Sequence, residues 1–526
     1  MHKVIICDKL SEEGIKILQD AGFTVDCKYK TPPEELKKII GNYHAAIVRS
    51  DTKFTKDIIE HAHNLKVIGR AGVGLDNVDI DAATKKGIIA MNSPGGNTIS
   101  TCEHSFAMML AVARSIPPAY VTLKAKQWER SKFKGVELYS KTIGIIGMGR
   151  IGKEMAKRAI AFGMNVMAYD PFISQEVAGK IGVTLAELDE LLKRADFITI
   201  HTPLTEETRH LISTKQFALM KPKAFLINCA RGEIVDEEAL YVALQEKKIA
   251  GAALDVFSKE PPVDFKLMEL DNVVVTPHLA ASTEEAQLNV AIEIAHCVRD
   301  ALLGKAIRNA ANYVQLDPET YKIIEPYFGL AEKMGKFISQ LTEGGVKTVK
   351  IFYLGEISSY KTDVLGSAFM KGVLSTSMEQ DVNYINALEI SKERGIKVEQ
   401  ISRREEEEYV SSLRVVVTTD KEERTLEGTL FANKEARFVM FDDIHVEVVP
   451  SDYLLVIRNW DKPGVIGFLG TTLGSNNINI AGMSLGRKTP KDIALTILNL
   501  DNPMTQKVLG EIAANSDIVS VKSVKL

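Results

Sequence analysis

Three residues that lie far apart in the sequence carry groups that can handle protons or anions. Arg231 and His278 each come just after an apolar, strand-like run, and Glu260 stands before two prolines. A histidine can take the proton of a substrate hydroxyl, and a carboxylate beside it holds the imidazole in one tautomer and favours its protonated form. An arginine binds a carboxylate through two parallel hydrogen bonds. Each residue also has an ordinary alternative: a loop or capping histidine, a solvated turn glutamate, and a surface ion-pair arginine.

A glycine pattern supplies the second chemical feature. G-x-G-x-x-G lies between a β-branched run at 142–146 and a segment of helical composition at 153–162, and its glycines are Gly147, Gly149 and Gly152. Such glycines permit a tight turn, a close approach of backbone to a pyrophosphate and close packing of helix on strand, with the phosphates at the helix N-terminus. The next strand-like run ends at Asp170, whose carboxylate would accept hydrogen bonds from a ribose and repel a 2′-phosphate.

The motif therefore predicts a dinucleotide cofactor, NAD rather than NADP. Next to a nicotinamide ring, the combination of Arg231, Glu260 and His278 suits hydride exchange with a 2-hydroxy or 2-keto acid.

The elements that must position these residues alternate between strands and helices. The alternation is complete once before the glycine pattern and repeats after it, which predicts two α/β units in tandem with ligands at the carboxyl ends of the strands. A long helical pattern at 282–304 would return the chain to the first unit. After about residue 309 the regular alternation of strands and helices ends. A helical stretch is predicted at 326–342, and the pattern of the last 75 or so residues predicts the order βαββαβ.

The predicted fold is therefore α/β, with two doubly wound parallel-sheet domains. The predicted domains are a discontinuous substrate-binding domain (1–97, completed by 283–310), a Rossmann-type NAD-binding domain (98–282), an α+β intervening domain (311–450) and a ferredoxin-like domain (451–526).

Composition excludes several classes of protein. A formal charge of −4 over 526 residues gives no reason to expect nucleic acid or an anionic membrane as partner. The five cysteines are scattered and never spaced C-x-x-C, which favours free thiols in a reducing compartment over disulfides or a metal site. The N-terminus is charged early, unlike a signal peptide, and no uncharged apolar run approaches a membrane span. We expect a cytoplasmic protein without a metal ion.

The segments 147–152, 228–232, 251–261 and 276–282 resemble the D-isomer-specific 2-hydroxyacid dehydrogenases, as does Gly-Arg-Ala-Gly-Val-Gly-Leu-Asp-Asn-Val-Asp at 69–79. The resemblance covers essentially the whole chain and implies that Arg231, Glu260 and His278 are catalytic. It implies an NAD site formed by Gly147, Gly149, Arg150, Ile151, Gly152, Asp170, Thr202, Cys229, Ala230, Asp255, Ala280 and Ala281. It also implies substrate contacts from Arg49, Ser50, Val73, Gly74 and Asn97.

One position departs from the family pattern. The family usually has glycine two residues after the catalytic histidine, whereas this chain has Ala280. Either the methyl group narrows the nicotinamide pocket, or the turn has a negative φ and tolerates alanine. We expect activity to persist.

The C-terminal unit resembles an ACT domain, a small amino-acid-binding fold that pairs across subunits. The resemblance rests on Arg-Asn-Trp-Asp-Lys-Pro-Gly-Val-Ile-Gly at 458–467 and Asn-Asn-Ile-Asn-Ile at 476–480. It implies that Asn459, Asp461 and Asn479 bind L-serine as an effector, with Asp461 at the ammonium group. The resemblance to the dehydrogenase family implies in addition that the protein is a homotetramer. The alternative is a ligand-free module that only assembles subunits.

Taken together, the resemblance implies NAD-dependent oxidation of D-3-phosphoglycerate to 3-phosphohydroxypyruvate, the first step of L-serine synthesis. This substrate carries a phosphate and a carboxylate, and Arg49 and Arg231 would supply two cations from different parts of the cleft to bind it. Two alternatives stay open: a family member that acts on glycerate, glyoxylate or lactate-like acids, and a non-catalytic NAD-sensing scaffold.

Overall fold

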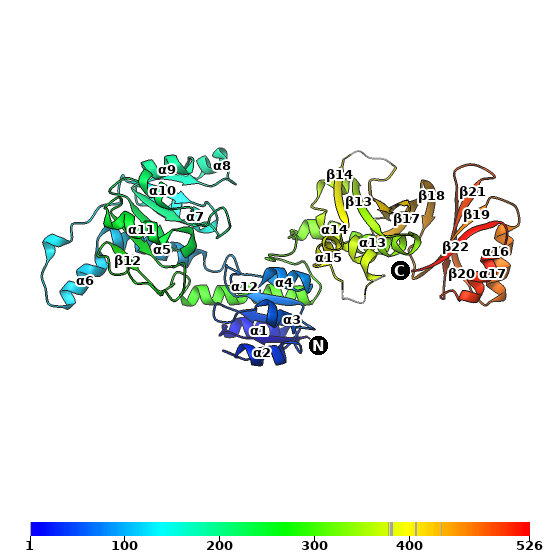
Figure 1. Cartoon of the computed structure of the whole chain (residues 1–526), viewed down its shortest axis with the longest axis horizontal. Coiled ribbons are helices and arrows are strands. Elements are labelled where there is room, and N and C mark those ends of the chain that lie inside the picture. The colour runs from blue at the N-terminus through cyan, green and yellow to red at the C-terminus, as the bar shows by residue number, and fades with distance from the viewer. Residues whose placement is uncertain (1, 377, 379–381, 405–407, 433) are drawn as a thin grey trace.

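The structure is a computed structural model of the chain that describes residues 2–376, 378, 382–404, 408–432 and 434–526. Four sheets follow one another along its long axis, with the seven-stranded sheet at one end and the four-stranded C-terminal sheet at the other (Figure 1). The fold class predicted from the sequence is confirmed.

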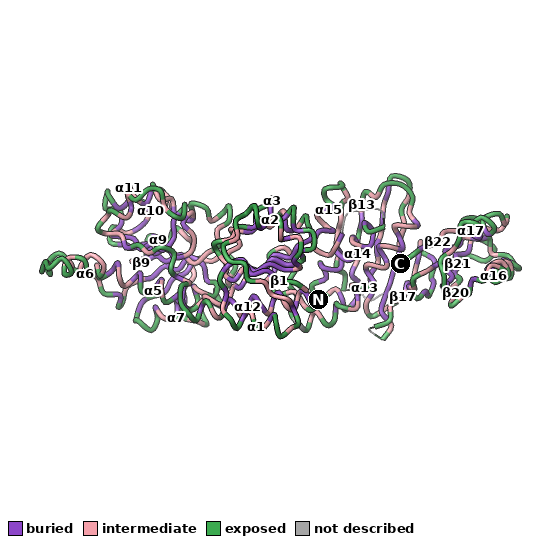
Figure 2. Tube along the Cα trace, turned by 90° about the horizontal axis from the view of Figure 1, so that it is seen from below, coloured by how far each residue is buried: buried purple, intermediate pink, exposed green. Residues whose placement is uncertain are grey.

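The first sheet is five-stranded and parallel, in the order β2-β1-β3-β4-β5. Apart from the edge strand β2, its strands are short, mainly apolar and largely buried runs, as a helix-covered parallel sheet requires (Figure 2). A long helix from later in the chain, α12, packs on it so closely that a Cβ at Gly69 would meet Ile294 and Val298. The elements are β1 (Lys3–Ile6), α1 (Glu12–Asp20), β2 (Thr24–Cys27), α2 (Pro33–Ile40), β3 (Ala45–Val48), α3 (Lys56–Glu60), β4 (Val67–Arg70), α4 (Ile80–Lys85), β5 (Ile89–Met91) and α12 (Glu284–Leu302).

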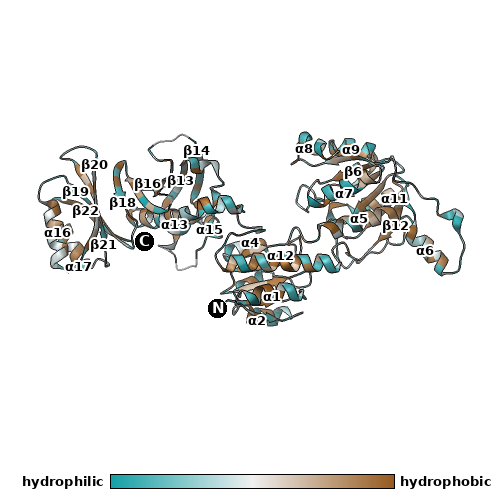
Figure 3. Ribbon diagram, turned by 180° about the vertical axis from the view of Figure 1, so that it is seen from behind, coloured by the Kyte–Doolittle hydropathy of each residue, from teal (hydrophilic) through white to brown (hydrophobic). Residues whose placement is uncertain are grey.

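The second sheet is seven-stranded and parallel, in the order β12-β11-β10-β9-β6-β7-β8. From β6 the chain adds β7 and β8 on one side and then β9 to β12 on the other, so the strand order reverses between β6 and β9. Open α/β sheets bind ligands at such a switch point. Brown, apolar strands lie between helices that turn teal faces outward (Figure 3). The elements are α5 (Thr98–Ala113), α6 (Ile116–Lys124), η1 (Arg130–Lys132), β6 (Thr142–Ile146), α7 (Arg150–Ala161), β7 (Asn165–Tyr169), α8 (Gln175–Lys180), β8 (Thr184–Leu185), α9 (Leu188–Arg194), β9 (Phe197–Ile200), α10 (Thr214–Leu219), β10 (Phe225–Asn228), η2 (Gly232–Ile234), α11 (Glu237–Gln245), β11 (Gly251–Leu254) and β12 (Val273–Val275).

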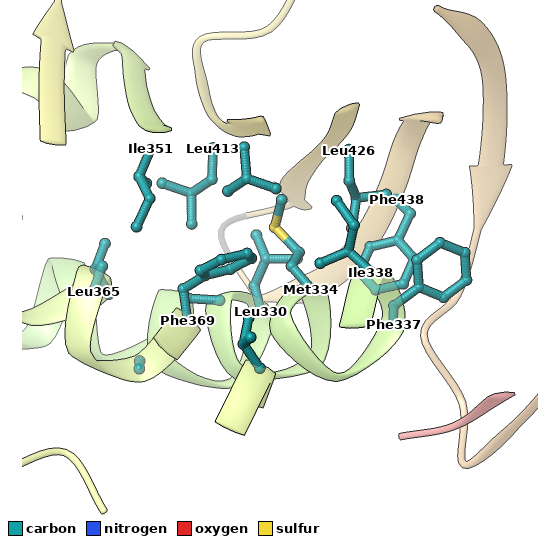
Figure 4. Packing of buried hydrophobic residues seen from close by; sticks show 14 of the residues in the cluster. Leu330, Met334, Phe337, Ile338, Ile351, Leu365, Phe369, Leu413, Leu426 and Phe438 are labelled. Atoms are coloured by element: carbon teal, nitrogen blue, oxygen red, sulfur yellow. The ribbon is translucent and has the colours of Figure 1, made fainter. Parts of the chain in front are cut away.

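The third sheet is six-stranded and mixed, in the order β14-β13-β15-β16-β17-β18, and is covered by α13 and α14. Figure 4 shows Leu330, Met334 and Phe337 of α13 packed toward Phe438 and Leu426 of the sheet. The elements are α13 (Pro318–Leu341), β13 (Val346–Gly355), η3 (Glu356–Ser359), α14 (Asp363–Ser375), α15 (Ala387–Glu393), β14 (Lys397–Arg403), β15 (Ser411–Thr419), β16 (Glu423–Phe431), β17 (Glu435–Phe441) and β18 (Ile444–Val448).

The helix that the sequence placed at 326–342 begins eight residues earlier. Asp317 caps α13 by accepting hydrogen bonds from the backbone N–H groups of Glu319 and Thr320, at 3.1 and 2.9 Å, and Pro318 follows it at the first helical position. Pro326 therefore lies inside the helix instead of starting it.

The fourth sheet is antiparallel, in the order β20-β21-β19-β22, and its βαββαβ order agrees with the prediction. One face is covered by its own two helices, through residues such as Leu455 and Leu469. The opposite face, through residues such as Leu454, Val456 and Ile497, joins the hydrophobic core of the third sheet. The elements are β19 (Tyr453–Trp460), α16 (Val465–Ser475), β20 (Ile480–Arg487), β21 (Ile493–Leu500), α17 (Gln506–Ala513) and β22 (Ile518–Lys525).

An arm at residues 115–140 projects from the second sheet (Figure 1). Neither α6 nor η1 has a buried residue, and Tyr120, Val121 and Trp128 are 61%, 63% and 82% exposed. Within the described residues no single helix has the length and apolarity to cross a membrane; α5 and α6 reach both only when taken together, and a bend of 65° separates them.

Candidate active site

The glycine loop joins β6 to α7 at the switch point of the second sheet. Gly147 has a φ of 95°, and a Cβ there would lie 2.7 Å from the carbonyl oxygen of His201. A Cβ at Gly152 would overlap the carbonyl oxygen of Gly147, so only glycine lets α7 approach the strand this closely. A Cβ at Gly149, in contrast, would meet no protein atom within 4 Å. The surface at Gly149, beside the N-terminus of α7, is therefore open to a phosphate group.

Asp170 follows β7 and lies beside this loop. Its carboxylate accepts hydrogen bonds from the backbone N–H groups of Met148 (2.7 Å) and Phe172 (2.8 Å). The carboxylate is thus fixed next to the glycine loop, where a ribose would follow the pyrophosphate.

Asp255 organises the segment that carries His278. We call residues 276–280 the catalytic turn. The fully buried Asp255 carboxylate accepts hydrogen bonds from Thr276 Oγ1 (2.6 Å) and from the backbone N–H groups of Leu279 (2.7 Å) and Ala280 (2.9 Å). Burial would raise the pKa of Asp255, but the donors around it hold that pKa below its usual value.

His278 has a φ of 55°, so the catalytic turn holds it in the left-handed region. Its backbone N–H donates to the Asp255 carbonyl at 2.9 Å. Ala280 has no positive φ, so alanine replaces the usual glycine there without backbone strain.

His278 and Glu260 form a hydrogen-bonded pair. His278 Nδ1 lies 2.7 Å from Glu260 Oε2, while Glu260 Oε1 accepts from the backbone N–H of Phe257 at 3.1 Å. The bond to Glu260 raises the pKa of His278, and burial opposes it only in part. Burial would raise the pKa of Glu260, but the bonds from His278 and Phe257 outweigh it and lower that pKa. Glu260 therefore favours an imidazolium at His278 and leaves Nε2 as the ring atom available to a substrate.

We call the units built on the first and second sheets the two lobes. Arg231 belongs to the second lobe, and its side chain reaches the first. Its Nη2 lies 3.2 Å from Asp76 Oδ2, and a Cβ at Gly74 would overlap both groups. Gly232 packs against the backbone of Phe257, which fixes the Arg231 loop beside the segment that leads to Glu260. The guanidinium is thus placed between the lobes, where it can bind an anionic substrate.

A cavity of about 440 Å³ lies between the two lobes and brings most of the predicted site residues together. The predicted residues that line it are Val73, Gly74, Asn97, Arg150, Ile151, Thr202, Cys229, Ala230, Arg231, His278, Ala280 and Ala281. The predicted residues that do not line it are Gly147, Gly149, Gly152, Asp170, Asp255, Glu260, Arg49 and Ser50.

Arg49 and Ser50 do not line this cavity. Arg49 lines a separate hollow with Lys9 and Gln287, and its backbone N–H donates to Asp8 at 2.5 Å. Ser50 Oγ donates only weakly to Asp51, at 3.4 Å.

The cavity walls carry polar atoms without a hydrogen-bond partner among the residues that the structure describes. Asn97 Oδ1, Thr101 Oγ1 and Thr202 Oγ1 are buried, line the cavity and make no hydrogen bond. Buried polar groups are normally satisfied, so these atoms fit a polar ligand between the lobes. Together with the open surface at Gly149, they fit a dinucleotide that runs from the glycine loop toward His278.

Two titratable groups in the cavity wall are uncharged. Burial raises the pKa of Cys229 to about 12 and lowers the pKa of His201 to about 4, so both are neutral near pH 7. Among the described residues, no three His, Cys, Asp or Glu side chains are grouped to hold a metal ion.

Sequence reasoning missed residues that the structure brings to the site. Thr101 and His104 lie on α5, and Asp76 faces Arg231. The spacing of Asn97, Thr101 and His104, four and then three residues apart, is a signal for one shared helix face that was available in the sequence.

The candidate effector residues of the fourth sheet do not converge. Asn459 is buried and accepts from Thr496 Oγ1 at 2.9 Å, while Asp461 accepts from Arg487 and from the backbone N–H of Lys491. Asn479 donates to Asp501 at 2.7 Å. Trp460 pairs with Ile493 and Ile480 with Leu500 on β21, so Asp461 and Asn479 lie at opposite ends of that strand, about 23 Å apart.

Comparison with known proteins adds independent findings. Residues 106–280 match the NAD-binding domain of D-isomer specific 2-hydroxyacid dehydrogenases, and residues 323–442 match the D-3-phosphoglycerate dehydrogenase intervening domain. The chain is 44% identical to the D-3-phosphoglycerate dehydrogenase of Methanocaldococcus jannaschii and 46% identical to that of Archaeoglobus fulgidus, in both cases over 100% of each chain. The Bacillus subtilis enzyme of that name is 42% identical over 100% of both chains.

Solved structures resemble the first two lobes. D-lactate dehydrogenase from Aquifex aeolicus, complexed with NAD and lactic acid, is 32% identical with a TM-score of 0.51, over 57% of this chain and 96% of that one. A glyoxylate reductase from Paecilomyes thermophila is 28% identical with a TM-score of 0.55, over 59% of this chain and 98% of that one.

Proposed function

We propose that this chain, which belongs to the D-3-phosphoglycerate dehydrogenases, oxidises D-3-phosphoglycerate to 3-phosphohydroxypyruvate with NAD as the oxidant. The observation that carries the proposal is the His278–Glu260 pair, 2.7 Å between Nδ1 and Oε2, because His278 lines the cavity that Arg231 also lines. The reaction would begin the route to L-serine.

Each residue has a role that follows from its position. His278 Nε2 accepts the proton of the substrate hydroxyl, and the Glu260 carboxylate stabilises the resulting imidazolium. Arg231 binds the substrate carboxylate, which takes the place of the exposed Asp76 carboxylate on the guanidinium. NAD, when bound, accepts the hydride from the substrate carbon.

The test is a steady-state assay of NADH formation with D-3-phosphoglycerate, and with D-glycerate as the control that lacks the phosphate. We expect kcat/KM to be highest for the phosphorylated acid. Equal or better turnover of D-glycerate, glyoxylate or lactate-like acids would favour another activity of the family. Absence of turnover with all of them, in a protein that binds NAD, would favour a scaffold.

L-Serine is the effector that we propose for the fourth sheet. The Asp461 side chain is 21% exposed, and the Lys491 N–H and Arg487, which pair with it, keep its pKa low. Because Asn479 lies at the far end of the sheet, a site that uses both residues requires a second copy of the chain. An effector changes activity only if it binds two states of the enzyme unequally.

Calorimetry with L-serine, and with D-serine as the matched ligand, tests this proposal. We expect binding of L-serine alone, loss of that binding in Asp461→Ala, and an unchanged rate of the variant without serine. No heat with wild type would refute the effector role.

A second copy would also cover the arm at 115–140. Its apolar side chains, Tyr120, Val121 and Trp128 among them, are exposed in the described part of the chain. Light scattering coupled to size exclusion should report a tetramer for wild type and a smaller assembly for Trp128→Glu. A monomeric wild type would refute the proposal.

A further inference from the structure

We infer that His104 is a positioning residue for the reaction: from helix α5 it holds the Asp255 carboxylate and, through it, the catalytic turn that carries His278. The inference rests on the proposed function, because it assigns His104 to the same site. His104 Nε2 lies 3.2 Å from Asp255 Oδ1 and 3.1 Å from Thr276 Oγ1.

The hydrogen-bond partners determine which ring nitrogen carries a proton. Thr276 lies only 2.6 Å from Asp255 Oδ1, so its hydroxyl hydrogen points to that carboxylate and its oxygen can only accept. An ionised carboxylate also only accepts. His104 Nε2 must therefore carry a hydrogen and donate it, since Thr276 Oγ1 and Asp255 Oδ1 can both only accept.

His104 differs from the other donors to Asp255 in its place in the chain. Thr276, Leu279 and Ala280 all belong to the catalytic turn. His104 comes instead from α5, which follows the crossover from the first sheet to the second. It therefore ties the turn to α5 through a hydrogen bond to a charged group, beside the longer contact of Thr276 Oγ1 with Met108 Sδ at 3.8 Å.

The same face of α5 looks into the cavity. Asn97, at the start of the helix, and Thr101 one turn later both line the cavity with buried, unpartnered oxygens. His104 continues that face by another turn. A ligand that engages Asn97 and Thr101 therefore fixes the helix whose next turn holds Asp255.

The consequence for His278 follows from its contacts. The turn places His278 in the left-handed region and within 2.7 Å of Glu260. Without the His104 donor, Asp255 loses one of its charge-assisted bonds and the turn can relax away from Glu260. The bond that raises the pKa of His278 would then weaken, and kcat would fall.

The experiment compares His104→Leu, which removes the donor, with His104→Gln, whose amide N–H can reach the Nε2 position. Glu103→Gln is the matched control, because Glu103 is the exposed neighbour on the same helix and pairs only loosely with Arg158, at 3.6 Å. We expect kcat of His104→Leu to fall by up to about tenfold, because His104 acts through the His278–Glu260 bond and its loss cannot cost more than that bond contributes. The acidic limb of its kcat/KM profile should move to lower pH. His104→Gln should recover most of both, and Glu103→Gln should match wild type.

A purely structural role predicts a different result. His104→Leu and His104→Gln would then lose activity equally, and the loss would accompany a lower Tm. The acidic limb of the kcat/KM profile would stay at the wild-type pH, and that outcome would overturn the inference. So would wild-type kcat in His104→Leu. If His104→Leu does not fold, His104→Ala, which also removes the donor, takes its place in the comparison with His104→Gln.

The assays separate this inference from the proposed function. An inactive wild type refutes the proposed function, whereas an active wild type with an indifferent His104 refutes only the positioning role.

Discussion

Replacing Glu260 by glutamine tests the central pair of the site. Glutamine keeps the size of the side chain and removes its charge, so His278 loses its partner for the imidazolium. A hydrogen bond to a charged group contributes about 1.5–3 kcal/mol when buried. Here the His278 and Glu260 side chains are 49% and 38% exposed, and solvent screening reduces the contribution to about 1.4 kcal/mol or less. That energy corresponds to a fall in kcat of up to about tenfold.

The pH profile carries the more specific prediction. Oxidation needs His278 unprotonated, so the rate rises with pH through its pKa. Glu260 raises that pKa in the wild type, and its loss lets the pKa fall toward the ordinary value. The acidic limb of kcat/KM should therefore move to lower pH in Glu260→Gln, although the plateau is lower.

The assay is NADH formation with D-3-phosphoglycerate across the acidic and neutral range, with Glu269→Gln as the control. Glu269 is an exposed carboxylate nearby in the sequence. It does not line the cavity and takes no part in the His278–Glu260 hydrogen bond. A limb that stays at the wild-type pH, with kcat within about twofold of wild type, would refute the assignment of Glu260 as the partner of the base.

Further substitutions test the rest of the site. Arg231→Lys loses the planar fork and should lower kcat/KM for D-3-phosphoglycerate about tenfold to a hundredfold with NAD affinity unchanged; an unchanged kcat/KM would contradict its role. Asp170→Asn keeps an acceptor for the backbone but loses the charge that repels a 2′-phosphate, so NADP use should improve at least about fivefold in kinetic comparison with NAD. Gly149→Ala should weaken NAD binding in calorimetry and leave the Tm unchanged, because its Cβ meets no protein atom. Gly152→Ala should instead lower stability by about 1–3 kcal/mol, because its Cβ overlaps the Gly147 carbonyl; a stable Gly152→Ala would show that α7 can shift.

The strands were predictable where a short run is apolar and buried on both faces. The β-branched run at 142–146, for example, is β6 residue for residue. The edge strand β2 (Thr24–Cys27) could not be found in this way, since it contains Asp26 and none of its residues is buried. Strand pairing, not sequence pattern, defines such an edge.

Local capping explains the missed helix start. The side chain of Asp317, followed by Pro318, is an N-terminal signal that precedes the apolar part of α13. An interpretation centred on Pro326 overlooked it, because proline inside a helix is uncommon. Tertiary packing of the apolar face keeps the helix continuous through Pro326.

Residue types at strand ends indicated the pair His278–Glu260 and the cation Arg231, because parallel strands bring their carboxyl ends to one edge. The sequence could not show that Arg49 lies on a separate hollow, or that His104 reaches Asp255, since both depend on how helices seat on the sheets. Nor could it show that Asn479 and Asp461 stand at opposite ends of one sheet.

The continuous core beneath the third and fourth sheets has a practical consequence for truncation. A chain cut after residue 450 would lack Leu454, Val456 and Ile497. The apolar face of the third sheet that packs against them would then be exposed to water. Such a fragment should tend to aggregate, so a change in its turnover would report lost packing before it reported on the proposed serine site.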